Sequence, residues 1–338
     1  MRSTEKPLVL TLGDPAGIGP DIALLAYQAR GAEPVPPFLL IGDSEIVEAR
    51  AEMLGLAPKF VTTEDPAFAV ERFADALPIL PVPVAGKVEP GSSALSSATA
   101  TERCIALGVE LVSNRSARAL VTNPISKAVL TRAGFAFPGH TEFLAHLAGM
   151  QPTDAVMMLA CDTLRVVPAT IHLPLKEVPG ALSQERLLKV LATTASALTR
   201  YFGIGEPRLA VTGLNPHAGE EGTMGREEIE IIAPAIAAAR ARGLNVSGPH
   251  PADTLFHAEA RRRYDAAIAM YHDQALVPFK TVAFEEGVNV TLGLPFIRTS
   301  PDHGTAFSLA GTGKASPRSL IAALRLAAKM HARAEAYA

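Results

Sequence analysis

The sequence predicts an α/β fold divided into two lobes. Short aliphatic or β-branched runs alternate with alanine-rich helical stretches, which is the pattern of βαβ units. The chain has 338 residues, and a single hydrophobic core usually stops growing near this length. Most strand candidates are also too apolar for a sheet with one solvated face. We therefore expect two lobes whose sheets are covered by helices.

The expected elements follow from the apolar runs and their boundaries. Strands are expected at residues 8–12, 38–41, 119–122, 155–160, 165–169, 209–212, 266–270 and 288–291. Pro20 can begin a helix that follows the first strand, and Ser316-Pro317 can begin a final helix that ends near His331. Four prolines and two glycines in residues 78–91 predict a connection across the surface.

The composition suits a globular enzyme and gives no reason to expect a nucleic-acid or membrane partner. Charged residues make up 19% of the chain and the formal net charge is −3. The one basic run, 261–263, is expected to be a solvated helix face. The first apolar run, 8–12, is too short for a signal peptide or a membrane span. Cys104 and Cys161 are expected to be buried thiols in a reducing compartment, so we expect a cytoplasmic protein.

Three histidines follow strand candidates. In an open parallel sheet, ligands bind beyond the carboxyl ends of the strands, where His172, His217 and His272 are expected to lie. Three imidazoles around one divalent ion leave a coordination position for a substrate. Asp273 or Asn215 could orient an imidazole. The alternative is that each is an ordinary loop histidine, because their separations of 45 and 55 residues form no compact motif.

A second set of residues suits an anion. Thr141 is expected to cap a helix whose free amides face the ligand, next to His140. Lys280, Asn289 and Arg298 flank a later strand candidate. Together these groups suit a phosphate and a carboxylate. The alternative for the lysine and the arginine is a surface charge in a weak ion pair.

Nucleotide-binding fingerprints are absent. Residues 13–20, Gly-Asp-Pro-Ala-Gly-Ile-Gly-Pro, join a strand to a helix but do not match the Gly-x-Gly-x-x-Gly pattern, because Ile22 stands where its third glycine would fall. The loop is therefore either a glycine-rich turn or a ligand contact. Gly313-Lys314 resembles part of a P-loop, but Ser308 and Ala315 replace its first glycine and its hydroxyl residue. This disfavours ATP, and any NAD must be held without a Rossmann turn.

With these residues in view, nearly the whole chain resembles the 4-hydroxythreonine-4-phosphate dehydrogenases of vitamin B6 biosynthesis. The motifs that carry the resemblance are residues 13–20, Gly-His-Thr-Glu-Phe at 139–143, Asn-Pro-His-Ala-Gly-Glu at 215–220, Pro-Ala-Asp-Thr-Leu-Phe at 251–256, Tyr-His-Asp-Gln-Ala-Leu-Val-Pro-Phe-Lys at 271–280, and Gly-Val-Asn-Val-Thr-Leu-Gly-Leu-Pro-Phe-Ile-Arg-Thr-Ser at 287–300. In combination these motifs are highly specific.

The resemblance implies a role for each candidate residue. The positions that match the family's metal ligands are His172, His217 and His272, and those that match its substrate-binding residues are His140, Thr141, Lys280, Asn289 and Arg298. The family is a homodimer whose active site lies at the subunit interface. In related dehydrogenases a similar loop, here His303-Gly304-Thr305-Ala306, cradles the adenosine of NAD.

The implied fold is that of isocitrate and isopropylmalate dehydrogenases, with two α/β/α lobes and no Rossmann turn. The cofactor lobe is expected at 1–130 plus 290–338, and the metal and substrate lobe at 131–289. The implied reaction is oxidation of 4-hydroxythreonine 4-phosphate by NAD or NADP with zinc, magnesium or cobalt, followed by decarboxylation. Asp253 is a candidate general base, with a metal-bound water or a lysine as alternatives. Alternative functions are a dehydrogenase of a four-carbon sugar-acid phosphate and a zinc hydrolase of a phosphorylated metabolite.

Overall fold

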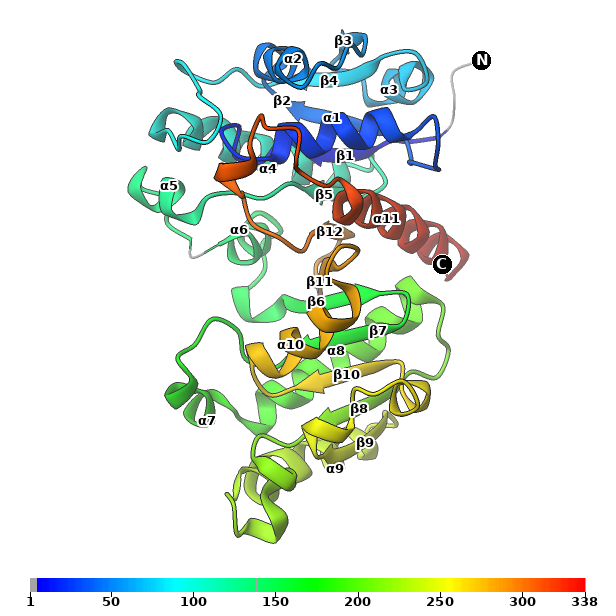
Figure 1. Cartoon of the computed structure of the whole chain (residues 1–338). Coiled ribbons are helices and arrows are strands. Elements are labelled where there is room, and N and C mark those ends of the chain that lie inside the picture. The colour runs from blue at the N-terminus through cyan, green and yellow to red at the C-terminus, as the bar shows by residue number, and fades with distance from the viewer. Residues whose placement is uncertain (1–4, 138, 338) are drawn as a thin grey trace. The chain divides into compact units, whose positions relative to one another are not determined.

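The computed structural model describes residues 5–137 and 139–337 (Figure 1). The chain forms two compact units: unit 1 comprises Met1–Ala155 and Leu294–His331, and unit 2 comprises Val156–Gly293 and Ala332–Ala338. Residues 131–155, which the sequence analysis assigned to the second lobe, thus belong to unit 1. The reason is that Phe143 and Leu144 are buried in the core of unit 1.

The described residues of unit 1 form strands in the order β3-β4-β2-β1-β5-β12, with parallel pairing throughout. The strands are β1 (Leu8–Thr11), β2 (Phe38–Gly42), β3 (Phe60–Thr62), β4 (Leu77–Pro81), β5 (Leu120–Thr122) and β12 (Arg298–Pro301). The helices are α1 (Gly19–Ala29), α2 (Ser44–Met53), α3 (Pro66–Arg72), α4 (Ala98–Ser113), α5 (Lys127–Arg132), α6 (His140–Leu147) and α11 (Arg318–Tyr337), with short η1 (Leu95–Ser97), η2 (Pro152–Asp154) and η8 (Phe307–Leu309).

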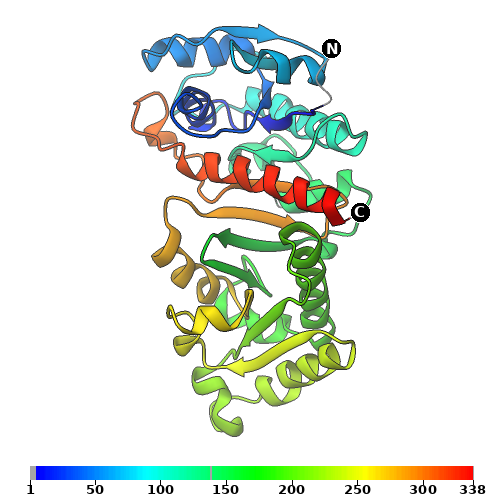
Figure 2. The ribbon, with the colours of Figure 1, turned by 90° about the vertical axis from the view of Figure 1, so that its right-hand side faces the viewer.

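The core of unit 1 lies between its sheet and the helices that cover it. Every residue of β1 and β2 is buried, as expected for parallel strands covered on both faces. Val9, Leu39 and Leu120 pack in one cluster with the apolar face of α4. Gly108 of α4 lets this helix approach the sheet, because a Cβ there would lie 2.7 Å from Leu120 Cδ1. Helix α11, red in Figure 2, runs beside β12, where Thr299 Oγ1 donates to Ala323 O at 2.9 Å.

In unit 2, the part of the chain that the structure describes forms strands in the order β11-β6-β7-β10-β8-β9. The strands are β6 (Val156–Cys161), β7 (Leu164–Pro168), β8 (Arg208–Thr212), β9 (Asn245–His250), β10 (Ala266–Ala269) and β11 (Val288–Leu292). The helical segments are η3 (Leu175–Glu177), α7 (Val178–Ala181), α8 (Gln184–Phe202), η4 (Pro216–Gly222), η5 (Glu228–Ile232), α9 (Ala233–Ala241), η6 (Ala252–Thr254), η7 (Ala260–Arg263) and α10 (His272–Ala283). Helices α8 and α9 lie on one face of this sheet and α10 on the other (Figure 2).

The α/β prediction is confirmed, and every strand candidate corresponds to an observed strand. Three details differ. The structure adds β3, β4, β9 and β12. The first part of residues 78–91 is not a surface connection but part of β4, because the alternating Leu77 and Ile79 are buried. Strand β6 is antiparallel to β7, because only two residues join them, and it is also antiparallel to β11.

Within the described part of the chain, no helix combines the length and the apolar composition needed to cross a bilayer. Cys104 and Cys161 are free thiols, the first buried as expected and the second only half-buried.

Candidate active site

Two of the three candidate metal ligands meet at a pocket in unit 2. The ring centroids of His172 and His272 are 5.7 Å apart. His172 follows β7 and His272 begins α10 directly after β10, so two neighbouring parallel strands deliver both rings to the same sheet edge. They line a cavity of about 250 Å³ with Thr170, Tyr271, Asp273 and three aliphatic side chains. This is the position that the crevice rule predicts for a ligand site.

An acidic neighbour orients one of these imidazoles. His272 Nδ1 lies 2.8 Å from Asp273 Oδ1. A carboxylate on one ring nitrogen fixes the tautomer and leaves Nε2 as the ligating atom, as is usual for metal-bound histidines. Asp273 is therefore placed as the sequence analysis expected. Asn215 is not, because its side-chain nitrogen donates instead to Glu227 Oε2 at 2.7 Å and to Glu228 Oε2 at 3.0 Å.

His217 does not join the other two rings within one chain. Across residues 5–137 and 139–337, no group of three or more histidine, cysteine, aspartate or glutamate side chains is arranged to hold a metal ion. His217 is exposed on η4, which follows β8, and both His217 and His172 adopt left-handed backbone conformations with φ of 51° and 49°. The paired imidazoles suit a divalent ion chemically, but one chain supplies only part of the expected ligand set.

Unit 1 holds a buried cationic site. Arg298 is 3% exposed and its Nη2 donates to Thr122 Oγ1 at 2.6 Å. Burial lowers the pKa of Arg298 to about 10. His140 Nε2 is buried, and no atom of the described residues hydrogen-bonds to it. Burial first, and then the charges of Arg298 and Lys127, hold the pKa of His140 well below its usual value, so the imidazole is neutral. A buried polar atom without a partner, beside two cations, is suited to an anionic ligand.

The start of α6 differs from the expected cap. Gly139 occupies the N-cap position with extended backbone, and the helix begins at His140, so Thr141 lies in the first turn and caps nothing. Gly139 leaves room here, because a Cβ would lie 3.1 Å from Lys127 Cε and 3.3 Å from both Lys127 Nζ and Glu142 Oε2. The glycine thus allows the ammonium group to approach the helix start, where backbone amides favour negative charge.

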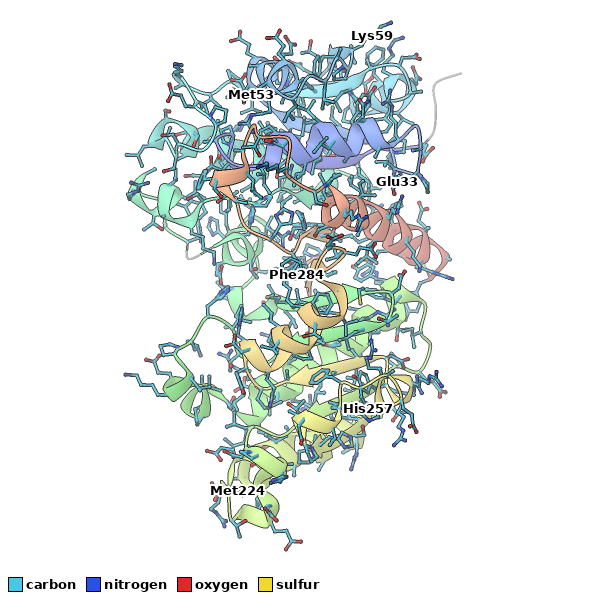
Figure 3. All side chains as sticks on the ribbon, in the orientation of Figure 1. Glu33, Met53, Lys59, Met224, His257 and Phe284 are labelled. Carbon is cyan, nitrogen blue, oxygen red and sulfur yellow. The ribbon has the colours of Figure 1, made fainter. Side chains whose placement is uncertain are left out.

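The remaining candidates lie in unit 2. Lys280 is half-buried on α10 and its Nζ is 5.5 Å from the ring of Phe284, which is 75% exposed at the end of that helix (Figure 3). Asn289 is half-buried on β11. Asp253 is exposed on η6. The five candidate substrate residues therefore divide into three from unit 1 and two from unit 2.

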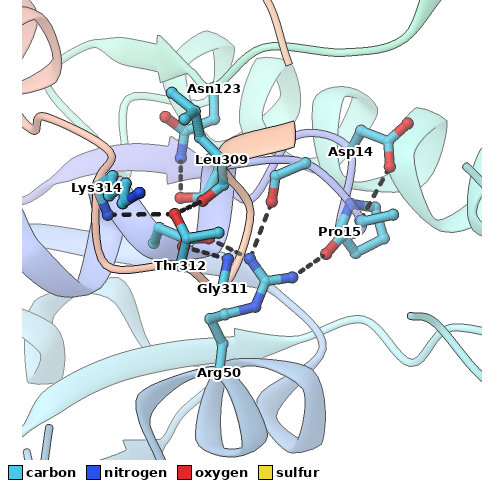
Figure 4. A network of polar contacts seen from close by, with 12 residues as sticks. Asp14, Pro15, Arg50, Asn123, Leu309, Gly311, Thr312 and Lys314 are labelled. Atoms are coloured by element: carbon cyan, nitrogen blue, oxygen red, sulfur yellow. Dashed lines mark hydrogen bonds and ion pairs between the residues drawn. The ribbon is translucent and has the colours of Figure 1, made fainter. Parts of the chain in front are cut away.

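The candidate cofactor loop packs against the glycine-rich loop in unit 1. Ile18 N donates to Thr305 O at 3.0 Å, and a Cβ on Gly17 would lie 2.9 Å from the same carbonyl. Arg50 fixes the glycine-rich loop by donating hydrogen bonds to Pro15 O at 3.1 Å and to Gly17 O at 3.0 Å (Figure 4). Gly17 is thus explained by close backbone packing, which is one of the two readings that the sequence left open.

Sequence reasoning missed three residues that shape these regions: Arg50, Lys127 and Glu228. Arg50 lies inside α2 and Glu228 begins η5, and nothing in their local sequence distinguishes them from surface charges. Lys127 had one available signal. It follows β5 by a few residues, at the sheet edge where ligands bind.

These features are typical of an α/β enzyme that binds an anionic small molecule. The sequence profile of the pyridoxal phosphate biosynthetic protein PdxA family matches residues 35–327. A 4-hydroxythreonine-4-phosphate dehydrogenase from Methylorubrum populi is 56% identical over 335 residues, which cover 98% of this chain and 96% of that protein. The crystal structure of 4-hydroxythreonine-4-phosphate dehydrogenase from Klebsiella pneumoniae matches with a TM-score of 0.86 and 37% identity, covering 97% of this chain and 100% of that one. The chain belongs to the PdxA family, which confirms the resemblance.

A more distant match has a different substrate in its name. The crystal structure of a terephthalate 1,2-cis-dihydrodioldehydrogenase from Burkholderia xenovorans matches with a TM-score of 0.63 and 29% identity, covering 96% of this chain and 98% of that one. The fold alone therefore does not specify the alcohol that is oxidised.

Proposed function

We propose that this chain is a cytoplasmic, NAD- and divalent-metal-dependent dehydrogenase of 4-hydroxythreonine 4-phosphate (4-phosphooxy-L-threonine). The product is a 3-keto acid that decarboxylates to 3-amino-2-oxopropyl phosphate on the route to pyridoxal 5'-phosphate. The observation that carries the proposal is the high identity to dehydrogenases of this name along nearly the whole chain. The imidazole pocket and the buried cationic site supply residues suited to this chemistry.

When bound, a divalent ion would lower the pKa of the substrate's C3 hydroxyl and NAD would accept the hydride. His172 and His272 are the proposed ligands from one pocket, with Asp273 fixing the second ring. His217 is the proposed third ligand. Because it stands apart from the pair within one chain, we propose that two subunits share each site in a homodimer.

Residues of unit 1 are proposed to bind the anionic end of the substrate. The guanidinium of Arg298 donates to Thr122 Oγ1, which fixes the direction of its plane toward the proposed oxyanion. The neutral His140 offers its buried Nε2 without adding a third positive charge. Thr141 in the first turn of α6, and Lys280 and Asn289 in unit 2, complete the proposed set. Fixing both ends of the substrate orients its C3 hydrogen toward the cofactor.

The loop at His303-Gly304-Thr305-Ala306 is proposed to bind the adenosine of NAD. The glycine-rich loop holds it through the hydrogen bond from Ile18 N to Thr305 O. Ala306 adopts a left-handed conformation with φ of 39°. Asp253, exposed on η6, remains the proposed general base on the strength of its position in the Pro-Ala-Asp-Thr-Leu-Phe motif, with a metal-bound water or a lysine as alternatives.

The experiment that tests this function mixes purified protein, a divalent metal, NAD⁺ and 4-hydroxythreonine 4-phosphate, and records NADH. We expect NADH only when all four are present and loss of activity after treatment with a chelator. Release of inorganic phosphate without NADH would favour a hydrolase instead. NADH from a four-carbon sugar-acid phosphate but not from the threonine derivative would favour the sister dehydrogenase, and NADP⁺ in parallel tests the cofactor preference.

A further inference from the structure

A buried carboxylate organises the loop that carries His217. Glu228 is 3% exposed and lies at the start of η5, a π-helical turn. Its Oε1 accepts hydrogen bonds from Leu214 N and Asn215 N, both at 2.8 Å. Its Oε2 accepts one from Asn215 Nδ2 at 3.0 Å. Oε1 therefore binds both residues that precede the Pro216-His217 pair, and Oε2 binds the second of them.

Close packing adds to these hydrogen bonds. A Cβ on Gly219 would lie 2.5 Å from Glu228 Oε2, and one on Gly213 would lie 3.0 Å from Glu228 Oε1. The carboxylate thus touches the backbone on both sides of His217. Gly219 also has a φ of 80°, which favours glycine at this position.

The loop itself adopts an unfavourable backbone conformation. Five consecutive residues from His217 to Glu221 have positive φ values between 41° and 80°. Four of them carry a Cβ, which clashes with the backbone in a left-handed turn. Such a conformation persists only when the surroundings hold it in place. Buried Glu228 contacts residues 213–219 on both sides of the histidine and thereby anchors the turn.

We propose that Glu228 is a positioning residue for the metal ligand His217. It acts through the backbone N–H groups of Leu214 and Asn215 and through the side-chain amide of Asn215, and it does not touch the metal. The proposal rests on the proposed role of His217 and goes further, because it assigns the placement of that ligand to a specific buried side chain. Without the carboxylate, we expect the left-handed turn to relax and the imidazole to lose its position.

Glu228→Gln tests this proposal with little change in size. Both oxygens of Glu228 accept hydrogen bonds, so the amide nitrogen of a glutamine faces an N–H donor whichever way it rotates. We expect the dissociation constant for Co²⁺ to rise by about 10- to 100-fold, the range seen when the residue that orients a metal ligand is lost. The visible spectrum of bound Co²⁺ should change as well. Glu230→Gln, on the same turn but exposed and paired with Arg226, is the matched control and should bind Co²⁺ like the wild type.

His217→Ala separates the two ways in which the proposal can fail. If His217→Ala loses Co²⁺ but a folded Glu228→Gln binds it with wild-type affinity and spectrum, Glu228 is merely structural and the inference is overturned. If His217→Ala itself binds Co²⁺ normally, the proposed metal site is wrong and the inference falls with it.

A second variant covers a folding defect. If circular dichroism shows that Glu228→Gln does not fold, Asn215→Ala is measured in its place, because it removes only the side-chain contacts with Glu227 and Glu228. We expect this variant to weaken Co²⁺ binding by about 3- to 10-fold, less than the range for a lost orienting residue. Wild-type affinity in a folded Asn215→Ala would then overturn the inference.

Discussion

Arg50 and Asp21 form a buried ion pair that joins three segments of unit 1. Their side chains are 2% and 0% exposed. Arg50 also donates to two carbonyls of the glycine-rich loop, while Asp21 Oδ1 accepts from Gly311 N at 2.7 Å (Figure 4). The pair therefore links helix α2 and the glycine-rich loop to the segment that follows the candidate cofactor loop.

Asp21→Asn should destabilise unit 1 and weaken cofactor binding. The change leaves the buried Arg50 without an anionic partner, which typically costs about 3–5 kcal/mol. We expect chemical denaturation to show this loss and steady-state kinetics to show a higher KM for NAD⁺. Breaking the exposed Arg226–Glu230 pair with Glu230→Gln should cost less than about 1 kcal/mol. Equal effects of the two substitutions would contradict the role given to the buried pair.

Asp273→Asn should weaken metal binding and leave the fold intact. Asp273 is largely exposed, so its removal costs little stability, but its hydrogen bond to His272 Nδ1 is lost or reversed. We expect the dissociation constant for Co²⁺ to rise by about 10- to 100-fold. The matched control is Glu206→Gln, an exposed acid of the same unit. Unchanged Co²⁺ affinity in Asp273→Asn would show that the carboxylate does not orient the ring.

Arg298→Lys should raise the KM for the phosphorylated substrate more than it lowers kcat. Lysine keeps the positive charge but lacks the planar fork that is held by Thr122. Losing a charge-assisted hydrogen bond worth about 1.5–3 kcal/mol corresponds to a KM increase of roughly 10- to 150-fold. Arg325→Lys, a more exposed arginine of unit 1 paired with Glu33, should leave the KM unchanged. A wild-type KM for Arg298→Lys would remove this residue from the proposed site.

His140 should make the protein less stable in acid. Its pKa in the folded protein lies well below the ordinary value of 6.5, so the unfolded chain binds the extra proton first. The contribution of neutral His140 to the free energy of unfolding is therefore complete above pH 6.5. It is lost as the pH drops below that value toward the pKa in the folded protein. Denaturation at about pH 7.5 and about pH 5.5 measures this loss. His140→Asn should lose less stability between the two pH values than the wild type, and an equal loss would contradict a neutral, buried His140.

The hydrophobic pattern of the sequence was sufficient to predict most of the strands. Strands such as β1 and β2 are apolar throughout because both faces are covered, and this signal is local. Strand β4 was missed because Pro78 and Pro81 signal a turn, whereas the burial of Leu77 and Ile79 depends on β2 and β3, which are distant in sequence. Likewise, the run 131–155 was assigned to the wrong unit because the packing of Phe143 is a tertiary contact.

The candidate site was predictable only in part. His172 and His272 could be placed together because each follows a strand of one parallel sheet. Thr141 was wrongly predicted to cap α6, since side-chain chemistry alone did not reveal that Gly139 would take the cap. Glu228 and Arg50 could not be recognised as buried, because a buried charge and a surface charge look alike in the sequence until their partners are known.

The central claim is that each metal site is shared between two subunits, and dimers of two different variants test it most directly. Two variants are co-expressed with different tags and purified as heterodimers. If His217 of one subunit completes the His172–His272 pair of the other, heterodimers of His217→Ala with His272→Ala should contain one intact site and show up to half of the wild-type NADH formation. Heterodimers of His172→Ala with His272→Ala should stay inactive, because that pair belongs to one pocket. Background activity in the first heterodimer, with its composition verified, would contradict a metal site shared in this way.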